Sequence, residues 1–175
     1  MLPFCLYGDN VEHKKSLILI GMPGSGKSTL GQLLAKKLGR AFIDTDLLIE
    51  SLYAMPLQKI TDMLPREDFL NVESKVICAL TSSDSVIATG GSVIYRPEAM
   101  EHLKSLGQII YLHTPLHIIK ARISQKPDRG ISFGPGQTIE DLFAERSPLY
   151  LDHANLTIDT NELNPEECAE KLASL

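Results

Sequence analysis

A glycine-rich segment near the N-terminus has residue types that suit phosphate binding. Residues 21–29 read GMPGSGKST and directly follow the apolar residues 17–20, which read LILI. Glycines let the backbone curl so that successive N–H groups converge on one phosphate, and a helix that begins at Lys27 adds its positive N-terminal end. The segment therefore predicts a binding site for a nucleoside triphosphate.

Two side chains of this loop have separate expected roles. Lys27 can reach the β- and γ-phosphate oxygens as a mobile positive charge. The Ser28 hydroxyl is the expected protein ligand of a Mg²⁺ ion that keeps most of its waters. Contacts with the nucleotide are expected from six consecutive residues: Gly24, Ser25, Gly26, Lys27, Ser28 and Thr29.

Two carboxylates follow the next apolar run of the chain. Asp44 and Asp46 flank Thr45 and come directly after residues 41–43, which read AFI. One carboxylate could anchor a metal ion, and the other could orient an acceptor hydroxyl and accept its proton. Alternatively, Asp44 or Thr45 caps the helix that follows. One turn can serve both purposes.

A pair of glycines follows a third apolar run. Residues 88–92 read ATGGS, and Gly90 and Gly91 would let the backbone approach another molecule without an intervening side chain. A turn needed only for chain direction is the alternative. The position at the end of a predicted strand favours contact with a substrate.

Residues 125–137 are rich in glycine and proline and lie between two predicted helices. This composition predicts a mobile lid, which would exclude water and bring Arg129 to the charge that develops during phosphoryl transfer. Arg122 and Arg146 lie on the flanking helices. From position alone, each could equally be a solvated surface charge.

Short apolar runs alternate with longer amphipathic stretches along the chain, which predicts a parallel sheet. The runs are continuous in Ile, Leu and Val, as in strands that are buried on both faces. We therefore expect a doubly wound α/β fold with a five-stranded parallel sheet, whose ligands bind at the carboxyl ends of the strands. The predicted strands are residues 16–20, 41–43, 85–88, 108–112 and 155–158. The predicted helices are residues 28–38, 46–53, 68–81, 97–106, 115–124, 138–152 and 165–173.

The composition is typical of one folded domain, because the chain has 175 residues, of which 43% are hydrophobic and 22% charged. We expect this domain to span residues 16–175 after a loose arm, residues 1–15. The net charge of −5 argues against a nucleic-acid partner, and no apolar stretch approaches the length of a membrane span. Cys5, Cys78 and Cys168 lack any metal-binding spacing, so we expect reduced thiols in a cytoplasmic protein, with a monomer as the default.

The ordered motifs resemble those of the shikimate kinase family over nearly the whole chain after about residue 15. The resemblance rests on GMPGSGKST, on FIDTD at residues 42–46, on the ATGG turn, on Arg129 and on ERSPLY at residues 145–150. It implies a P-loop kinase fold with a mobile lid. The implied reaction is ATP- and Mg²⁺-dependent phosphoryl transfer to a hydroxyl of a small carboxylate, foremost shikimate, in aromatic amino acid biosynthesis.

The resemblance also implies roles at the acceptor and the metal ion. Ser28 and Asp44 would hold Mg²⁺ directly or through water, and Asp46 would contact the acceptor hydroxyl. Gly91 would offer its backbone to the substrate. Arg146 would pair with the substrate carboxylate.

Further implied roles concern the nucleotide. Arg122 would lie on one side of the adenine, with the region of Pro165 on the other. Lys27 and Arg129 would neutralise the transferring phosphoryl group.

Three positions depart from the pattern of the family. Leu70 stands where the family usually has the arginine of a Phe-Arg pair, which helps Arg146 to bind the substrate carboxylate. The loss of one such group could cost a few kcal/mol of charge-assisted binding. Ser92 replaces the third glycine of a Gly-Gly-Gly turn, and residues 129–131 read RGI in place of Arg-Pro-Leu. Either a Lys or Arg from elsewhere compensates for Leu70, or the pocket takes another small alcohol.

Three alternative functions follow from these departures. A kinase of the same fold could act on a hydroxy amino acid such as homoserine, whose ammonium group Glu67, Asp68 or Glu73 could meet. A protein of another class could bind nucleotide as a regulatory switch. A degenerate kinase fold could also bind ATP without turnover, and Leu70 is the best support for that third possibility. The sequence lacks the Asn-Lys-x-Asp motif of guanine-nucleotide switches, which favours a kinase.

Overall fold

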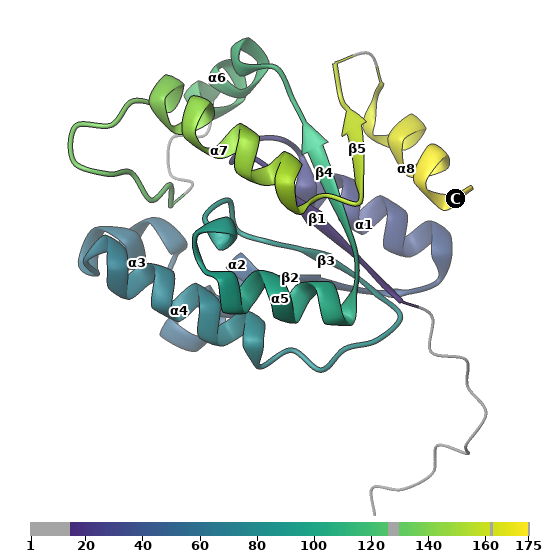
Figure 1. Cartoon of the computed structure of the whole chain (residues 1–175), viewed down its shortest axis with the longest axis horizontal. Helices are drawn as coiled ribbons and strands as arrows, with labels where there is room; N and C mark the ends of the chain where they lie inside the picture. Colours follow the sequence, from purple (N-terminus) through teal and green to yellow (C-terminus); the bar gives the residue numbers. More distant parts are fainter. Residues whose placement is uncertain (1–14, 126–129, 162, 175) are drawn as a thin grey trace, which may run out of the picture.

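The computed structural model describes residues 15–125, 130–161 and 163–174 and contains one sheet at its centre (Figure 1). The strand order is β2-β3-β1-β4-β5, and every neighbouring pair is parallel. The five-stranded parallel sheet predicted from the sequence is confirmed. Its strands are β1 Ser16–Ile20, β2 Ala41–Asp44, β3 Ser85–Ala88, β4 Gly107–His113 and β5 Leu156–Asp159.

Helices occupy the connections between the strands. They are α1 Lys27–Leu38, α2 Thr45–Tyr53, α3 Leu57–Met63, α4 Arg66–Cys78, the 3₁₀ turn η1 Val93–Tyr95, α5 Pro97–Leu106, α6 Leu116–Gln125, α7 Ile139–His153 and α8 Pro165–Ala173. All seven helices predicted from the sequence are present. Helix α3 and η1 were not predicted, because segments of seven and three residues are too short to show a helical period.

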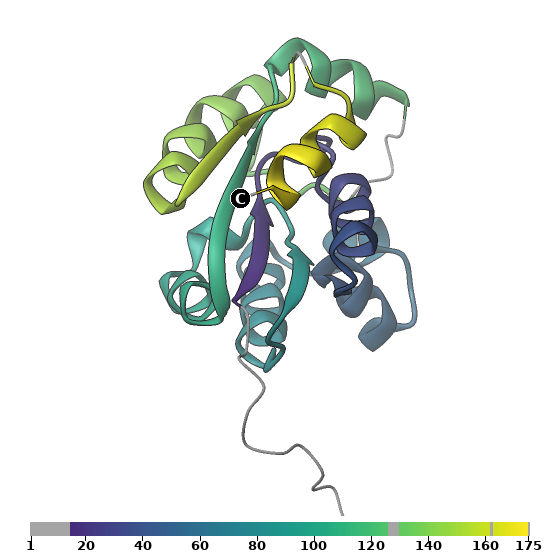
Figure 2. The same ribbon diagram turned by 90° about the vertical axis from the view of Figure 1, so that its right-hand side faces the viewer.

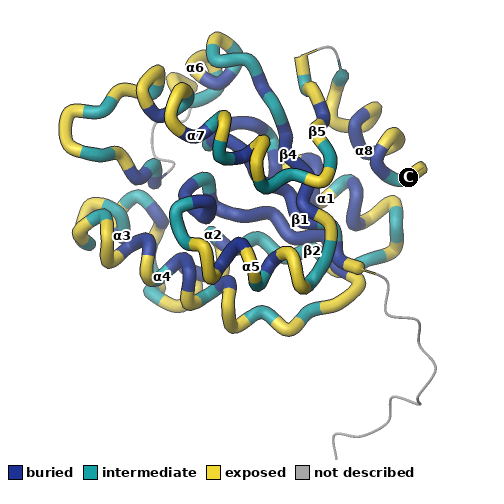
Figure 3. Tube along the Cα trace, viewed as in Figure 1, coloured by how far each residue is buried: buried dark blue, intermediate teal, exposed yellow. Residues whose placement is uncertain are grey.

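The two faces of the sheet are covered by different helices. Successive residues of a strand point to opposite faces, so Ile18 and Ile20 pack with α5 and α7, whereas Leu19 packs with α1 and α8. Figure 2 shows α1 and α8 on one side of the sheet and α5 and α7 on the other. The central strands β1, β3 and β4 are largely buried (Figure 3), as their continuous apolar sequences predicted, whereas the edge strands β2 and β5 are only partly buried. The fold is therefore doubly wound.

A small separate core joins α2, α3 and α4. It consists of Ile49, Leu57, Ile60 and Phe69, and these three helices lie together beside the β2 side of the sheet in Figure 1. Burial of Leu57 and Ile60 explains why a helix as short as α3 is stable here. No helix in the described parts of the chain has the length and apolar character needed to cross a membrane.

The strand order brings the predicted chemical groups to one edge. Strand β1 lies between β3 and β4, and β2 lies beyond β3. Because the carboxyl ends of parallel strands meet at one edge, the loop after β1, the aspartates after β2 and the glycines after β3 become neighbours. The sequence indicated the strand ends, and the sheet order makes them adjacent.

The packing of α1 on the sheet generates a stability prediction. Leu34 is fully buried in the core between α1, α8 and the sheet, so we expect Leu34→Ala to lower the free energy of unfolding by about 2–5 kcal/mol. Urea denaturation measures this loss. The exposed Lys36→Ala on the same helix should change stability by less than about 0.5 kcal/mol. Similar losses in both variants would contradict the described packing.

Candidate active site

The phosphate-binding loop joins β1 to α1. Gly26 lies directly before the helix with φ of 100°, a backbone conformation that favours glycine. The Ser25 N–H donates to the Met22 carbonyl at 3.1 Å, which closes the turn. The N-terminal end of α1 therefore points into the loop, where it can stabilise a negative charge.

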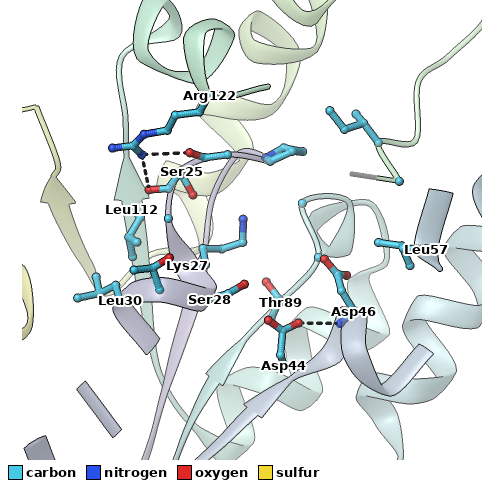
Figure 4. A pocket seen from close by; sticks show the side chains of 18 of the residues that line it. Ser25, Lys27, Ser28, Leu30, Asp44, Asp46, Leu57, Thr89, Leu112 and Arg122 are labelled. Atoms are coloured by element: carbon cyan, nitrogen blue, oxygen red, sulfur yellow. Dashed lines mark hydrogen bonds between the residues drawn. The ribbon is translucent and has the colours of Figure 1, made fainter. Parts of the chain in front are cut away.

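Lys27 holds its ammonium group above the loop. Its Nζ donates to the carbonyls of Gly21 at 2.8 Å and Met22 at 2.9 Å, and the residue is 8% exposed. Burial lowers the pKa of Lys27 to about 8, against the opposing effect of the Asp46 and Asp44 charges. The lysine thus lies within the electrostatic influence of both aspartates (Figure 4).

The two aspartates after β2 are in different situations. Asp44 Oδ1 accepts a hydrogen bond from the Asp46 N–H at 3.0 Å, so Asp44 does cap α2. The cap occupies one carboxylate oxygen, and Asp44 also lines the cavity described below. Burial, followed by the Asp44 charge, raises the pKa of Asp46 to about 6. Asp46 therefore takes up a proton at a higher pH than an ordinary aspartate does.

Glu73 of α4 is a third acidic group at this site. It is 1% exposed, and its Oε2 accepts a hydrogen bond from the Ser92 hydroxyl at 2.7 Å. Its Oε1 is buried and has no hydrogen-bond partner among the described residues. Burial, followed by the Asp46 charge, raises the pKa of Glu73 to about 7. Ser92, which the sequence showed only as a departure from a family pattern, is thus the hydroxyl that positions this carboxyl.

The glycine turn after β3 lies against these acids. A Cβ atom on Gly90 would overlap Glu73 Oε1 and would lie 2.8 Å from Asp46 Oδ1. Only glycine allows this approach to the two acidic side chains, and the predicted contact of the turn with a substrate stays a prediction. The Gly90 N–H is held by the Thr45 hydroxyl at 3.1 Å, and the Gly91 carbonyl accepts from the Tyr150 hydroxyl at 2.6 Å.

Arg146 of α7 is buried behind Gly91. The residue is 1% exposed, and a Cβ on Gly91 would lie 3.1 Å from its Nη1. Arg146 Nε donates to the Tyr95 hydroxyl at 3.1 Å, and Nη2 donates to the Ser132 carbonyl at 3.0 Å. The burial of Arg146 excludes the alternative, left open by the sequence, that it is a solvated residue on the surface. A fixed, buried guanidinium is suited to binding an anion.

Arg122 and Pro165 lie on the phosphate-loop side of the site. Arg122 Nη1 donates to the carbonyls of Gly24 at 3.1 Å and Ser25 at 3.3 Å (Figure 4), so this arginine is not a free surface charge either. Pro165 is the first residue of α8, which Asn164 caps. Both residues line the same cavity as the loop.

One cavity of about 580 Å³ connects these groups. The cavity is lined by the six predicted phosphate-loop residues, both aspartates, both glycines, Arg122 and Pro165. Thr89, which the sequence analysis did not assign to the site, also lines it, as does Glu73, which was considered only as a partner of an ammonium group. Arg146 lies just behind the wall, against Gly91. The predicted catalytic Arg129 and most of the predicted N-terminal arm, residues 1–14, lie outside the described residues. Of the predicted lid, Gly130, Ile131 and Ser132 line the cavity.

The oxygen donors near the loop suit a hard cation. Ser28 and Asp44 both line the cavity, and a hydroxyl with one carboxylate matches a Mg²⁺ ion that keeps several waters. Within the described ranges, no cluster of three or more His, Cys, Asp or Glu side chains could enclose a metal by itself. A metal at this site would therefore depend on oxygens of the nucleotide.

Comparisons with known proteins agree with this geometry. The family model described as shikimate kinase matches residues 23–175. A shikimate kinase of Thermodesulfovibrio yellowstonii is 38% identical over 161 residues, which cover 90% of this chain and 92% of that protein. A shikimate kinase of Pseudomonas aeruginosa is 36% identical over 167 residues, which cover 91% of this chain and 97% of that protein.

A solved structure shows the same arrangement. The shikimate kinase from Acinetobacter baumannii, in complex with shikimate, has 32% sequence identity and a TM-score of 0.84 over 92% of each chain. The family model covers every described residue from 23 onward. The chain belongs to the shikimate kinase family.

Proposed function

We propose that this protein is a kinase that transfers the γ-phosphoryl group of ATP to a hydroxyl of shikimate. The observation that carries the proposal is the single cavity, with a phosphate loop at one end and Asp46, Glu73 and the nearby Arg146 at the other. Shikimate is a small hydroxylated carboxylate, and the solved relative from A. baumannii is described as binding it. Carboxylates suit its hydroxyls, and a buried arginine suits its carboxylate.

At the nucleotide end, Lys27 supplies a cation for the β- and γ-phosphates. Phosphate oxygens carry negative charge, so their hydrogen bonds with the Lys27 ammonium are stronger than those that it makes to the neutral carbonyls of Gly21 and Met22. The added negative charge also favours protonated Lys27 and so opposes the effect of burial on its pKa. The adenine lies between Arg122 and Pro165 in this proposal.

Ser28 and Asp44 hold Mg²⁺, directly or through water, in this proposal. The bound ion supplies charge neutralisation for the phosphates and a bridge between their oxygens. Asp44 can do this while it caps α2, because the cap uses only its Oδ1 atom.

At the acceptor end, Asp46 orients the acceptor hydroxyl and receives its proton late in the transfer. A loose phosphoryl transition state does not need a strong base, so a carboxylate with a pKa near 6 is sufficient. Gly90 and Gly91 leave room for the substrate beside the backbone, and Arg146 binds its carboxylate. Arg129 remains a predicted partner of the transferring phosphoryl group.

The homoserine alternative depends on an acidic partner for an ammonium group. Of the three acids considered, only Glu73 lines the cavity. Glu67 pairs with Arg96 at 2.7 Å on the surface, and Asp68 is exposed. Glu73 is already bonded to Ser92 and has a raised pKa, which makes it a weaker partner for a cation at neutral pH.

We further propose that residues 16–175 act as a single domain, as a monomer, in the cytoplasm. All strands of the described chain join one sheet, which supports one domain. The net charge of −5 supports small-molecule substrates rather than a nucleic-acid partner.

The function predicts acceptor-dependent ADP release. Purified protein with ATP and Mg²⁺ should release ADP at about 1–100 s⁻¹ when shikimate is present, the usual range for kinases. ADP release with homoserine, or without an acceptor, should be far slower, because in neither case is a suitable hydroxyl held at the acceptor end of the cavity. A coupled spectrophotometric assay measures all three. Release that is equal with and without shikimate would contradict the proposal.

The role of Asp46 predicts the effect of its neutral isostere. Asp46→Asn should lower kcat by about 10²–10⁴-fold, because an amide cannot take the proton of the acceptor hydroxyl, while the Kd for ATP stays nearly unchanged. In the wild type, kcat/KM for shikimate should fall as the pH drops below about 6, where Asp46 becomes protonated.

The matched control is Asp152→Asn, which changes an exposed aspartate of α7. It should keep wild-type rates and the same pH profile. A fully active Asp46→Asn variant would remove Asp46 from the mechanism.

The raised pKa of Glu73 predicts a pH-dependent stability. Between about pH 4.5 and 7 the folded protein binds more protons at Glu73 than the unfolded chain, so this group lowers stability as the pH rises through that window. Glu73→Gln removes the effect. The quantity to compare is the free energy of unfolding of Glu73→Gln minus that of the wild type. This difference should be about 1–3 kcal/mol larger at pH 8 than at pH 5.

Urea denaturation of the ligand-free proteins at both pH values measures this difference. The exposed Glu166→Gln should show no such change between the two pH values. A Glu73→Gln effect of equal size at pH 5 and pH 8 would mean that Glu73 has an ordinary pKa.

A further inference from the structure

Helix α4 presents an arginine on the same face as the position where the family usually has one. Arg66 lies four residues before Leu70, so the two side chains leave one face of the helix. Phe69 and Glu73 also belong to this face, and both line the cavity. Arg66 therefore begins the helical face that forms the acceptor end of the site.

Arg66 and Arg146 meet at one aromatic ring. The Arg66 Cζ atom lies 4.8 Å from the centre of the Tyr95 ring, and the Arg146 Cζ atom lies 5.1 Å from it. Arg146 also contacts Tyr95 and Ser132 through hydrogen bonds, and Ser132 lines the cavity. Two guanidinium groups from distant parts of the sequence thus share one neighbourhood beside the acceptor end.

Arg66 has unused hydrogen-bonding capacity. Its Nε atom is buried without a hydrogen-bond partner, and no carboxylate of the described residues lies within ion-pair distance of it. Arg40 and Arg96, in contrast, pair with Asp84 at 2.8 Å and Glu67 at 2.7 Å. A guanidinium has five donors arranged to match a carboxylate, so Arg66 can accept an anion without giving up an ion pair.

Helix stability does not account for an arginine at this position. Arg66 is the first residue of α4, where the positive end of the helix disfavours another positive charge. Glu67 and Asp68, in the same turn, have the sign that the helix favours. The arginine therefore has another reason to be there.

We propose that Arg66 binds the carboxylate of the acceptor together with Arg146. The inference rests on the proposed function and assigns its carboxylate subsite. Leu70 is 2% exposed and packs inside the protein, so the second cation of the subsite comes from one helical turn earlier. The pocket consequently selects acceptors that carry a carboxylate, even though residue 70 is apolar.

Steady-state kinetics with shikimate at saturating ATP test this role. Arg66→Leu should raise the KM for shikimate by about 10–100-fold, as expected for the loss of a charge-assisted contact, with kcat and the KM for ATP within about threefold of wild type. Arg66→Lys should give an intermediate KM, because it keeps the charge and loses the planar fork. Lys75→Leu removes the same charge from an exposed position of α4 and should leave the KM unchanged.

Shikimate methyl ester supplies the second arm, because it keeps the hydroxyls and lacks the negative charge. The wild type and Arg66→Leu should phosphorylate the ester with similar kcat/KM. An equal loss with acid and ester would mean that Arg66 acts only on structure, and the proposal would be overturned. Thermal melting checks that each variant is folded, and Arg66→Gln, which keeps a polar side chain of similar length, replaces Arg66→Leu if that variant unfolds.

The two proposals fail in different ways. A wild type that never phosphorylates shikimate contradicts the proposed function itself. A wild type that does, with an unchanged KM in Arg66→Leu, contradicts only the assignment of Arg66.

Discussion

The burial of opposite charges at one edge of the sheet is the constraint on which the site depends. Lys27 and Glu73 are buried and Asp46 is partly buried, and this burial shifts the pKa of each group in the direction that favours its neutral form. The lysine and the acids partly offset this cost by attracting one another. Phosphates beside the lysine and a hydroxyl beside the acids would complete the arrangement, so the folded chain is already organised for phosphoryl transfer.

The architecture holds the charged side chains of the site close together in fixed positions. The order β2-β3-β1 sets the aspartates, the glycine turn and the phosphate loop side by side. Gly90 permits contact with the acids, and Ser92 fixes one oxygen of Glu73. Tyr95 and Tyr150 hold Arg146 and the Gly91 carbonyl from the other side. Glu73, Arg146 and the Gly91 carbonyl are thus positioned by hydroxyl groups of residues that do not themselves react.

Much of the fold could be predicted from the sequence, because its signals are local. Apolar runs gave the strands to within a residue or two, as for residues 108–112 against the observed Gly107–His113. The phosphate loop was equally clear, since its chemistry lies in nine consecutive residues. Helix α3 was missed because seven residues between two prolines show no periodicity, and its stability comes from burial of Leu57 and Ile60.

The acceptor end was harder to predict, because its contacts join residues far apart in the chain. The bond between Ser92 and Glu73 spans 19 residues, and the ring shared by Arg66 and Arg146 lies between α4 and α7. The apolar Leu70 suggested a missing cation, and only the tertiary structure shows that Arg66 and Arg146 contact the same Tyr95 ring.

This cavity should direct the γ-phosphoryl group of ATP to a hydroxyl of shikimate and not to water. Mass spectrometry of the products formed from shikimate and ATP labelled with ¹⁸O in its γ-phosphoryl group distinguishes the two routes. We expect a shikimate product that has gained one phosphoryl group carrying the label. Label found only in inorganic phosphate, with shikimate unchanged, would contradict this expectation.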